Sequence, residues 1–112
     1  MAIPVQEKNG IVVIDFSGKI DIRLRKAVHD ILEDKIANKK TLFLCNFSNV
    51  EFVDSSGLGI LISMIKKVSV NSGQLKICCV NSAIMELLQL SHLLQVFDIY
   101  ETVDDAIESF QV

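Results

Sequence analysis

The apolar residues of this chain change their spacing several times, and these changes constrain the fold more than any other feature. Thr41 to Cys45 is a short, continuous apolar run, which is typical of a strand buried on both faces. Gln74 to Val80 is strand-like again, and Gly73 before it is expected to end a helix in a left-handed conformation. That helix is predicted by apolar residues at helical spacing, namely Leu58, Leu61, Ile62, Ile65 and Val68. Such alternation predicts right-handed crossovers and a largely parallel sheet.

The N-terminal part of the chain adds a hairpin and a further helix to this pattern. Asn9-Gly10 lies between two strand-like runs, Ile3 to Gln6 and Ile11 to Phe16, and Asn-Gly is a strong hairpin signal. Helical spacing from about Ile22 to Asn38 follows Ser17-Gly18.

The C-terminal part adds two helices and a strand. We expect Ser82 to cap a helix that runs to Leu90, and Val96 to Tyr100 to form the last strand. Thr102 with Asp105 resembles a capping box that opens a final helix. The sequence therefore predicts a single α/β domain over residues 1–112, of order ββαβαβαβα, with a mostly parallel sheet begun by an antiparallel hairpin.

Composition excludes several classes of partner. The chain has 112 residues, half of them apolar, which suffices for one core. Its 11 basic and 14 acidic residues give a net charge of −3, which does not attract nucleic acid or an anionic membrane. Glu7 and Lys8 stand where a secretory peptide would continue its apolar core, and no apolar run is long enough to span a bilayer. We therefore expect a cytoplasmic protein.

The three cysteines, Cys45, Cys78 and Cys79, lie inside apolar runs, so we expect buried, reduced thiols rather than a disulfide framework. Neighbours on a strand point to opposite faces, which predicts that the thiols of Cys78 and Cys79 are separated. His29 and His92 are not spaced to complete a metal site with these cysteines.

The junction FVDSSGLGI, Phe52 to Ile60, places two of the five glycines at the start of a helix. Each costs about 1 kcal/mol relative to alanine there, and we expect Ser55 or Ser56 near the N-cap. The glycines either let the helix pack closely against the sheet or present a serine hydroxyl to another protein's active site. If the flanking strands are parallel, the turn from Gly18 to Asp21 and the turn at Asp54-Ser55 meet at the sheet edge where such folds place their sites.

Known catalytic and nucleotide-binding motifs do not fit this junction. A nucleophile elbow needs glycine two residues before and after its serine, and neither Ser55 nor Ser56 meets this requirement. A dinucleotide fingerprint needs a third glycine where Ile62 stands, and no GK[ST] follows for a P-loop. A response-regulator receiver with Asp54 as phosphoacceptor would need an acidic pair after its first strand, where this chain has Gln6 to Lys8.

The string FVDSSGLGILISM closely resembles the STAS domain of bacterial anti-sigma factor antagonists. The segment Leu44 to Val50 before it and the glycine-containing turn into Leu75 to Val80 after it fit the same family. Ser17 to Asp21 resembles the family's G-x-[LI]-D turn, and Val96 to Thr102 with Asp105-Ala106 resembles its closing strand and helix. The resemblance covers essentially the whole chain.

In that family, the serine after the aspartate is phosphorylated by the partner, an anti-sigma factor with serine kinase activity, and this modification ends binding. The resemblance places the phosphorylated serine at Ser55. It implies a non-enzymatic binding module without a cofactor, which releases a sigma factor and is restored by a phosphatase acting on phospho-Ser55. The partner-binding residues that it implies are Gly18, Asp21, Arg23, Asp54, Ser55, Ser56, Gly57, Leu58 and Gly59.

Some residues near this site depart from the family pattern or leave alternatives open. Leu24 stands where threonine is common, which affects the partner surface, and Leu90 to Leu93 lacks the glycine that often ends the third helix. The basic residues Arg23, Arg25 and Lys26 fall in the first turns of a helix, where its dipole disfavours cations. They are either solvated or face the Ser55 edge, where they meet acidic groups of the partner or hold the phosphate.

Two other classes of function stay open at this stage. The fold could serve as a STAS scaffold subunit of a lipid-transport or sensory assembly, without phosphorylation. A small enzyme or nucleotide binder is the third class, although the chain has no complete motif for one. The sequence leaves the cognate sigma factor and the oligomeric state open.

Overall fold

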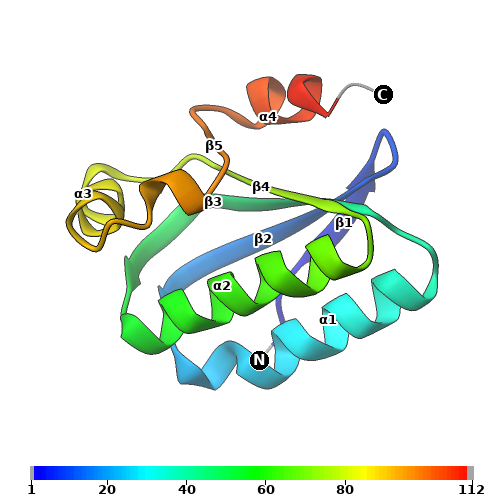
Figure 1. Ribbon diagram of the computed structural model, residues 1–112, viewed down its shortest axis with the longest axis horizontal. Coiled ribbons are helices and arrows are strands. Elements are labelled where there is room, and N and C mark those ends of the chain that lie inside the picture. Colours follow the sequence, from blue (N-terminus) through cyan, green and yellow to red (C-terminus); the bar gives the residue numbers. More distant parts are fainter. Residues whose placement is uncertain (1, 111–112) are drawn as a thin grey trace.

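A five-stranded sheet forms the centre of the computed structural model, which describes residues 2–110 (Figure 1). Its strands lie side by side in chain order: β1 (Val5–Lys8), β2 (Ile11–Ile20), β3 (Leu42–Val53), β4 (Gln74–Cys78) and β5 (Ile99–Tyr100). β1 pairs with β2 in antiparallel fashion, and the other neighbours are parallel. The predicted hairpin at Asn9-Gly10 is confirmed, with positive φ at both residues.

The helices are divided between the two faces of this sheet. In chain order they are η1 (Ile22–Leu24), α1 (Arg25–Ala37), α2 (Ser55–Val70), α3 (Ser82–Leu90), η2 (Leu94–Val96) and α4 (Val103–Ser109). α1 and α2 lie side by side on one face, and α4 lies on the other (Figure 1). α3 lies near the end where β2 and β3 finish (Figure 1). The predicted α/β class and element order are confirmed. No helix within residues 2–110 combines the length and apolar character needed to cross a bilayer.

Both faces of the central strands are buried, as the continuous apolar runs predicted. Phe16 of β2 and Phe47 of β3 meet edge to face in the main cluster, with ring centroids 5.7 Å apart. A smaller cluster beneath α4 joins alternate residues of the same strands to that helix: Ile11, Val13, Leu44, Cys78, Ala106 and Phe110. The sheet is thereby packed on both of its faces.

Several predicted boundaries were wrong, and the segment Gly18 to Asp21 is the one that bears on function. It is not a turn up to Asp21, because β2 continues through Gly18 to Ile20. Gly18 has a φ of +66° beside a shift in the β2–β3 register, so a bulge keeps the strand paired. The helix that follows begins as the 3₁₀ turn η1 and becomes α-helical only at Arg25.

Helix ends also differ from their predicted residues. Asn81, not Ser82, caps α3, and its side chain accepts the backbone N–H of Ile84. Ser72, not Gly73, takes the left-handed conformation after α2. The backbone of Gly73 instead lies so close to Thr41 that a Cβ would stand 2.5 Å from its carbonyl oxygen.

The C-terminal elements agree only in part with those predicted from the sequence. The last strand is confined to Ile99–Tyr100, because Leu94–Val96 forms the 3₁₀ turn η2. The predicted cap at Thr102 is confirmed, since its hydroxyl accepts the backbone N–H of Asp105 at 3.0 Å.

The two adjacent cysteines are not separated by the sheet. Cys79 follows the end of β4 with a φ of +65°, and this turn places Cys79 against the same cluster that buries Cys78. The alternation expected of a strand therefore stops at Cys78. Cys45 and Cys78 are buried, and Cys79 is half-buried.

Candidate functional site

The candidate site lies where the parallel strands β2 and β3 end next to each other. Ile20 and Val53 are partners at the last position of both strands, and the backbone N–H of Asp54 donates to the carbonyl oxygen of Ile20 at 3.3 Å. Asp21 opens η1 and Asp54 opens α2 directly after these residues. The two segments meet at the carboxyl edge of the sheet, as the parallel arrangement predicted.

The N-cap of α2 is Asp54, and Ser55 starts the helix next to it, as expected, but the capping acceptor is the carboxylate of Asp54 rather than a serine hydroxyl. Its carboxylate accepts the backbone N–H of Gly57 at 2.8 Å and the hydroxyl of Ser56 at 2.7 Å. The Ser56 hydroxyl, together with the Gly57 amide, holds the pKa of the Asp54 carboxyl below its usual value. Asp54 is therefore ionised at neutral pH, with its charge at the helix end that favours an anion.

The two serines of the junction differ in their availability. Ser56 is half-buried and its hydroxyl is committed to Asp54. Ser55 is exposed, and within residues 2–110 its hydroxyl has no hydrogen-bond partner. Of the two, only Ser55 presents a free hydroxyl to another protein.

The two glycines of the junction have different structural roles. A Cβ on Gly57 would overlap the carbonyl oxygen of Ile20 and stand 2.8 Å from its carbonyl carbon, so the start of α2 needs a glycine to pack against β2. A Cβ on Gly59 would meet nothing within 4 Å, and Gly59 is exposed one helical turn after Ser55. Close packing against the sheet therefore explains Gly57 but not Gly59.

The carboxylate of Asp21 forms an ion pair with Arg23. Arg23 Nη2 and Nε donate to the two carboxylate oxygens of Asp21 at 2.8 to 3.2 Å, and the backbone N–H of Arg23 donates to Oδ1 at 3.0 Å. These bonds from Arg23 lower the pKa of Asp21. The pair caps and fixes η1 beside the start of α2.

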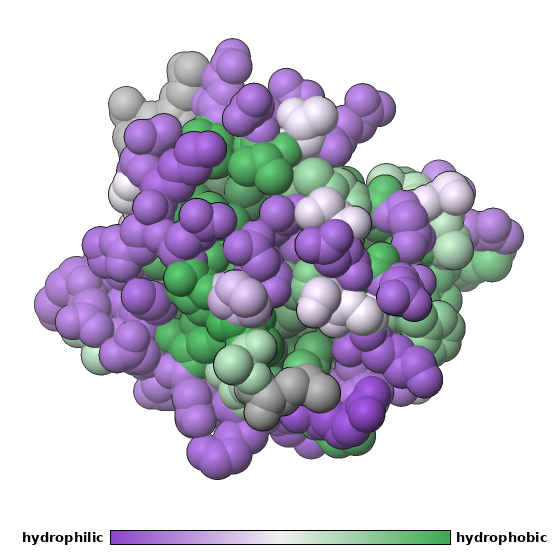
Figure 2. Space-filling view, turned by 180° about the vertical axis from the view of Figure 1, so that it is seen from behind, coloured by the Kyte–Doolittle hydropathy of each residue, from purple (hydrophilic) through white to green (hydrophobic). Residues whose placement is uncertain are grey.

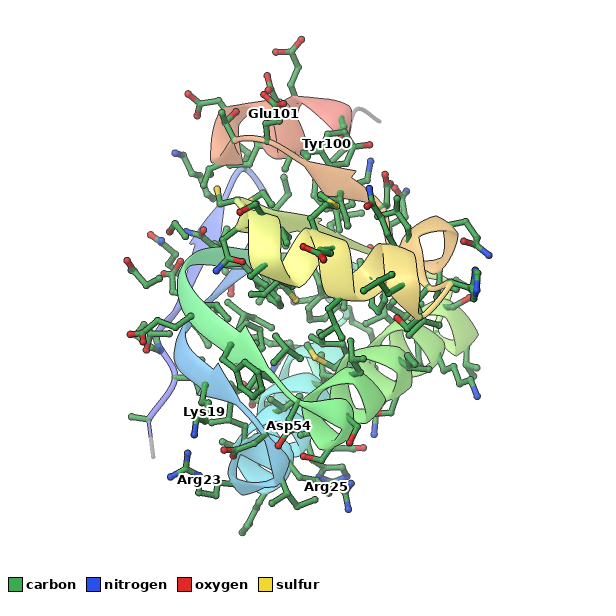
Figure 3. All side chains as sticks on the ribbon, turned by 90° about the vertical axis from the view of Figure 1, so that its left-hand side faces the viewer. Lys19, Arg23, Arg25, Asp54, Tyr100 and Glu101 are labelled. Carbon is green, nitrogen blue, oxygen red and sulfur yellow. The ribbon has the colours of Figure 1, made fainter. Side chains whose placement is uncertain are left out.

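Positive charge surrounds the junction. Figure 3 shows Lys19, Arg23 and Arg25 at the same end of the molecule as Asp54. Lys26 pairs with Asp30 at 3.0 Å, whereas Lys19 and Arg25 form no ion pair within residues 2–110. Lys19 and Arg25 are therefore the cations available to a partner or to a phosphate.

Two exposed apolar residues at this end were not predicted. Ile22 of η1 is 50% exposed and Phe52 of β3 is 51% exposed, and the Lys19 ammonium lies 6.0 Å from the centroid of the Phe52 ring. Because the register of β2 against β3 shifts, the regular alternation of buried and exposed side chains along a strand does not predict the exposure of Phe52. The only sequence signal for Ile22 was an apolar residue between Asp21 and Arg23.

Not every residue implied by the resemblance is on the surface. Leu58 and Gly57 are buried under the first turn of α2, and Gly18 is half-buried in β2. The exposed part of the candidate site consists of Ser55, Gly59 and their neighbours on η1 and β3.

The STAS domain family model matches residues 2–106. The chain therefore belongs to the STAS domain family. An anti-sigma F factor antagonist of Paenibacillus polymyxa is 25% identical to this STAS domain, with the match covering 100% of this chain and 97% of the relative. The resemblance inferred from the DSSGLG junction is confirmed at the level of the family.

Solved structures share the fold of this STAS domain. An anti-sigma factor antagonist from Mycobacterium paratuberculosis is 27% identical, with a TM-score of 0.81 and coverage of 96% of this chain and 92% of the other. The Bacillus protein SpoIIAA in its phosphorylated form has a TM-score of 0.74 at 20% identity, with coverage of 98% and 100%.

Proposed function

We propose that this chain is an anti-sigma factor antagonist and that residues 1–112 form a single STAS domain. In its unphosphorylated form it binds a cognate anti-sigma factor and so releases a sigma factor. The names of full-length relatives from Paenibacillus and Mycobacterium tuberculosis support this proposal, since each is called an antagonist of an anti-sigma factor. The chain acts by binding and holds no cofactor in this role.

The finer part of the proposal is a switch at Ser55. The anti-sigma factor has serine kinase activity, phosphorylates Ser55, and thereby ends the complex. The observation that carries this assignment is the contrast between the free, exposed hydroxyl of Ser55 and the committed hydroxyl of Ser56. SpoIIAA, a structural neighbour, has been solved with and without phosphorylation, which supports a phosphorylated form in the family.

A phosphate on Ser55 would change the interface more than the fold. It adds about −1.5 to −2 charges, and the first turn of α2 favours an anion by only about 0.3–1 kcal/mol. At a partner interface, an unpaired buried charge costs about 2–5 kcal/mol, which is roughly 30-fold to a few thousandfold in affinity. The adjacent carboxylate of Asp54 adds repulsion. Binding is therefore lost without refolding.

The test is incubation with the cognate serine-kinase anti-sigma factor of the source bacterium in the presence of ATP. Wild type and Ser56→Ala should each gain one phosphate by intact-mass measurement, and Ser55→Ala should gain none. Ser55→Asp should bind the kinase at least about 30-fold more weakly than Ser55→Ala. Equal affinity of these two variants would contradict the switch.

A phosphatase acting on phospho-Ser55 completes the proposed cycle. It should return the phosphorylated protein to the unmodified mass and restore binding. If neither kinase binding nor phosphorylation occurs, the scaffold role in another bacterial assembly becomes the better account. Ser55→Ala and Ser55→Asp would then both bind the assembly like wild type.

A further inference from the structure

The charges of this STAS domain are divided unevenly along the chain. Residues 1–76 contain all eleven basic residues and only eight acidic ones. After Lys76 there is no lysine or arginine, but there are six acids: Glu86, Asp98, Glu101, Asp104, Asp105 and Glu108. The net charge of −3 is therefore the sum of a basic N-terminal part, residues 1–76, and an acidic C-terminal third.

This division also exists in space. Figure 3 shows Glu101 and Tyr100 at the end of the molecule opposite to Lys19, Arg23 and Arg25. In Figure 2, hydrophilic residues dominate the upper part, where α4 lies, with apolar patches between them. Such a separation favours approach of a basic partner to the α4 end and an acidic partner to the Ser55 end.

Two neighbouring pockets lie within the acidic end. The larger, of about 820 Å³, is formed by α3, η2 and β5 and has apolar walls that include Val80, Met85, Leu94 and Phe97, with Asp98, Glu101 and Ser82 among its polar groups. The smaller, of about 340 Å³, is lined by Tyr100, Asp105, Glu108 and Ser109. Tyr100 lines both pockets, so they adjoin each other at this residue of β5, and we call the two pockets together the Tyr100 groove.

The nearest cation, Lys76, is in contact with Tyr100: its ammonium donates to the Tyr100 hydroxyl at 3.3 Å and lies 5.1 Å from the centroid of the ring. Among the described residues, it does not pair with the carboxylates that lie on either side of Tyr100 in the two pockets, other than Asp98. Lys76 is buried, and its ammonium donates to the hydroxyl of Ser109 at 2.8 Å and to the carbonyl oxygen of Ser109 at 3.1 Å. It lies 3.6 Å from one oxygen of Asp98. Within residues 2–110, no ion pair involves Glu101, Asp105 or Glu108. Three carboxylates around Tyr100 therefore have their charge free for a ligand.

We propose that the Tyr100 groove binds a basic segment of a partner protein. An apolar side chain of the segment enters the larger pocket and contacts its apolar wall. An arginine or lysine next to it lies over the smaller pocket, where the carboxylates of Glu101, Asp105 and Glu108 surround its charge. This site is separate from the Ser55 end, so one STAS domain can hold two partners at once.

The test uses a short, blocked peptide of alternating arginine and leucine as the probe, with wild-type protein. Amide shifts in an NMR titration should concentrate on α3, β5 and α4, and calorimetric affinity should fall as salt rises. The same peptide with serine in place of leucine should bind markedly more weakly. Equal binding of both peptides, shifts concentrated at the Ser55 end, or equally tight binding of arginine amide alone would each overturn the proposal.

Matched variants separate the groove from general charge attraction. Glu101→Lys should weaken the affinity for the peptide about tenfold or more. Asp104→Lys makes the same charge change on an exposed residue that lines neither pocket, and it should have much less effect on the affinity. Equal losses in both would overturn the proposal. Ser82→Tyr, which fills the larger pocket without a charge change, should remove the preference for the leucine peptide, and a retained preference would overturn it.

Discussion

A side chain on Gly57 would overlap the backbone carbonyl of Ile20, so these two residues hold the start of α2 against the end of β2. The same carbonyl oxygen accepts the backbone N–H of Asp54. The segment that we propose to be phosphorylated is thus held against the sheet by main-chain atoms on both sides of Ser55. The two glycines of the junction can be tested separately because only one takes part in this contact.

Gly57→Ala should destabilise the protein by about 1–3 kcal/mol, because an added methyl group must displace backbone. Gly59→Ala should stabilise it by about 0.5–1 kcal/mol, because alanine is the better helix former and its Cβ meets nothing. Urea unfolding of both variants measures these changes. A loss of stability in Gly59→Ala would show that Gly59 has a structural role after all.

Gly59→Ala should at the same time weaken binding to the anti-sigma factor, because its methyl group lies one turn from Ser55 on the exposed face of α2. Titration calorimetry with the partner measures this effect. Ser63→Ala, a further turn along the helix, is a control of similar size. A variant that is more stable and binds as tightly as wild type would remove Gly59 from the proposed interface.

Acid should destabilise the protein through carboxylates such as Asp54. Its folded pKa is below the ordinary value of 3.8 because of the Ser56 hydroxyl and the Gly57 amide. The stabilisation is therefore complete above pH 3.8 and is lost as the pH falls through the lower, folded pKa. Ser56→Ala should raise the pKa of Asp54 in a carboxyl NMR titration, and an unchanged value would contradict the assigned cause.

Arg25→Glu should slow association with the anti-sigma factor, because Arg25 lacks an ion pair within the described residues and lies at the Ser55 end. The reduction should be about tenfold in low salt and should shrink as salt screens the charge. Lys66→Glu, an equal charge change at an exposed position of α2, should have a smaller effect. Equal rates for wild type and Arg25→Glu at low salt would contradict this role.

The thiols should differ in their reaction with a disulfide reagent. Burial raises the pKa of the Cys45 thiol, and burial together with the neighbouring Cys79 raises the pKa of Cys78 to about 12. Half-buried Cys79 should therefore react first at pH 8, and the other two only after unfolding. Mass spectrometry of the modified peptides identifies the sites. Rapid labelling of Cys45 in folded protein would contradict the packing around β3.

The order of the elements could be predicted because each depends on the local spacing of apolar residues. Their ends could not, because long-range contacts decide them. Position 73 requires glycine because its backbone lies close to Thr41, and not because it has a left-handed φ. β2 continues beyond Gly18 because it stays paired with β3 there. The local sequence of either segment does not show which other segment packs against it in the fold.

The candidate site was proposed from the sequence, but the arrangement of its residues could not be predicted in detail. Its residues form one local string, so Ser55 and Asp54 could be named from sequence. Which group caps α2 depends on competition between Asp54 and two serines, and the ionised carboxylate is the stronger acceptor. The exposure of Phe52 depends on the register shifts between β2 and β3, and that of Ile22 on the 3₁₀ turn η1.

The joined ends of β2 and β3 have a thermodynamic consequence for recognition. Because η1 and the start of α2 are anchored to paired strands, a partner meets a surface that is already assembled. Association then requires little ordering of the backbone, so the loss of conformational entropy on binding is small. We therefore expect the heat capacity change of complex formation to reflect the area of contact alone, without a contribution from folding of the switch region.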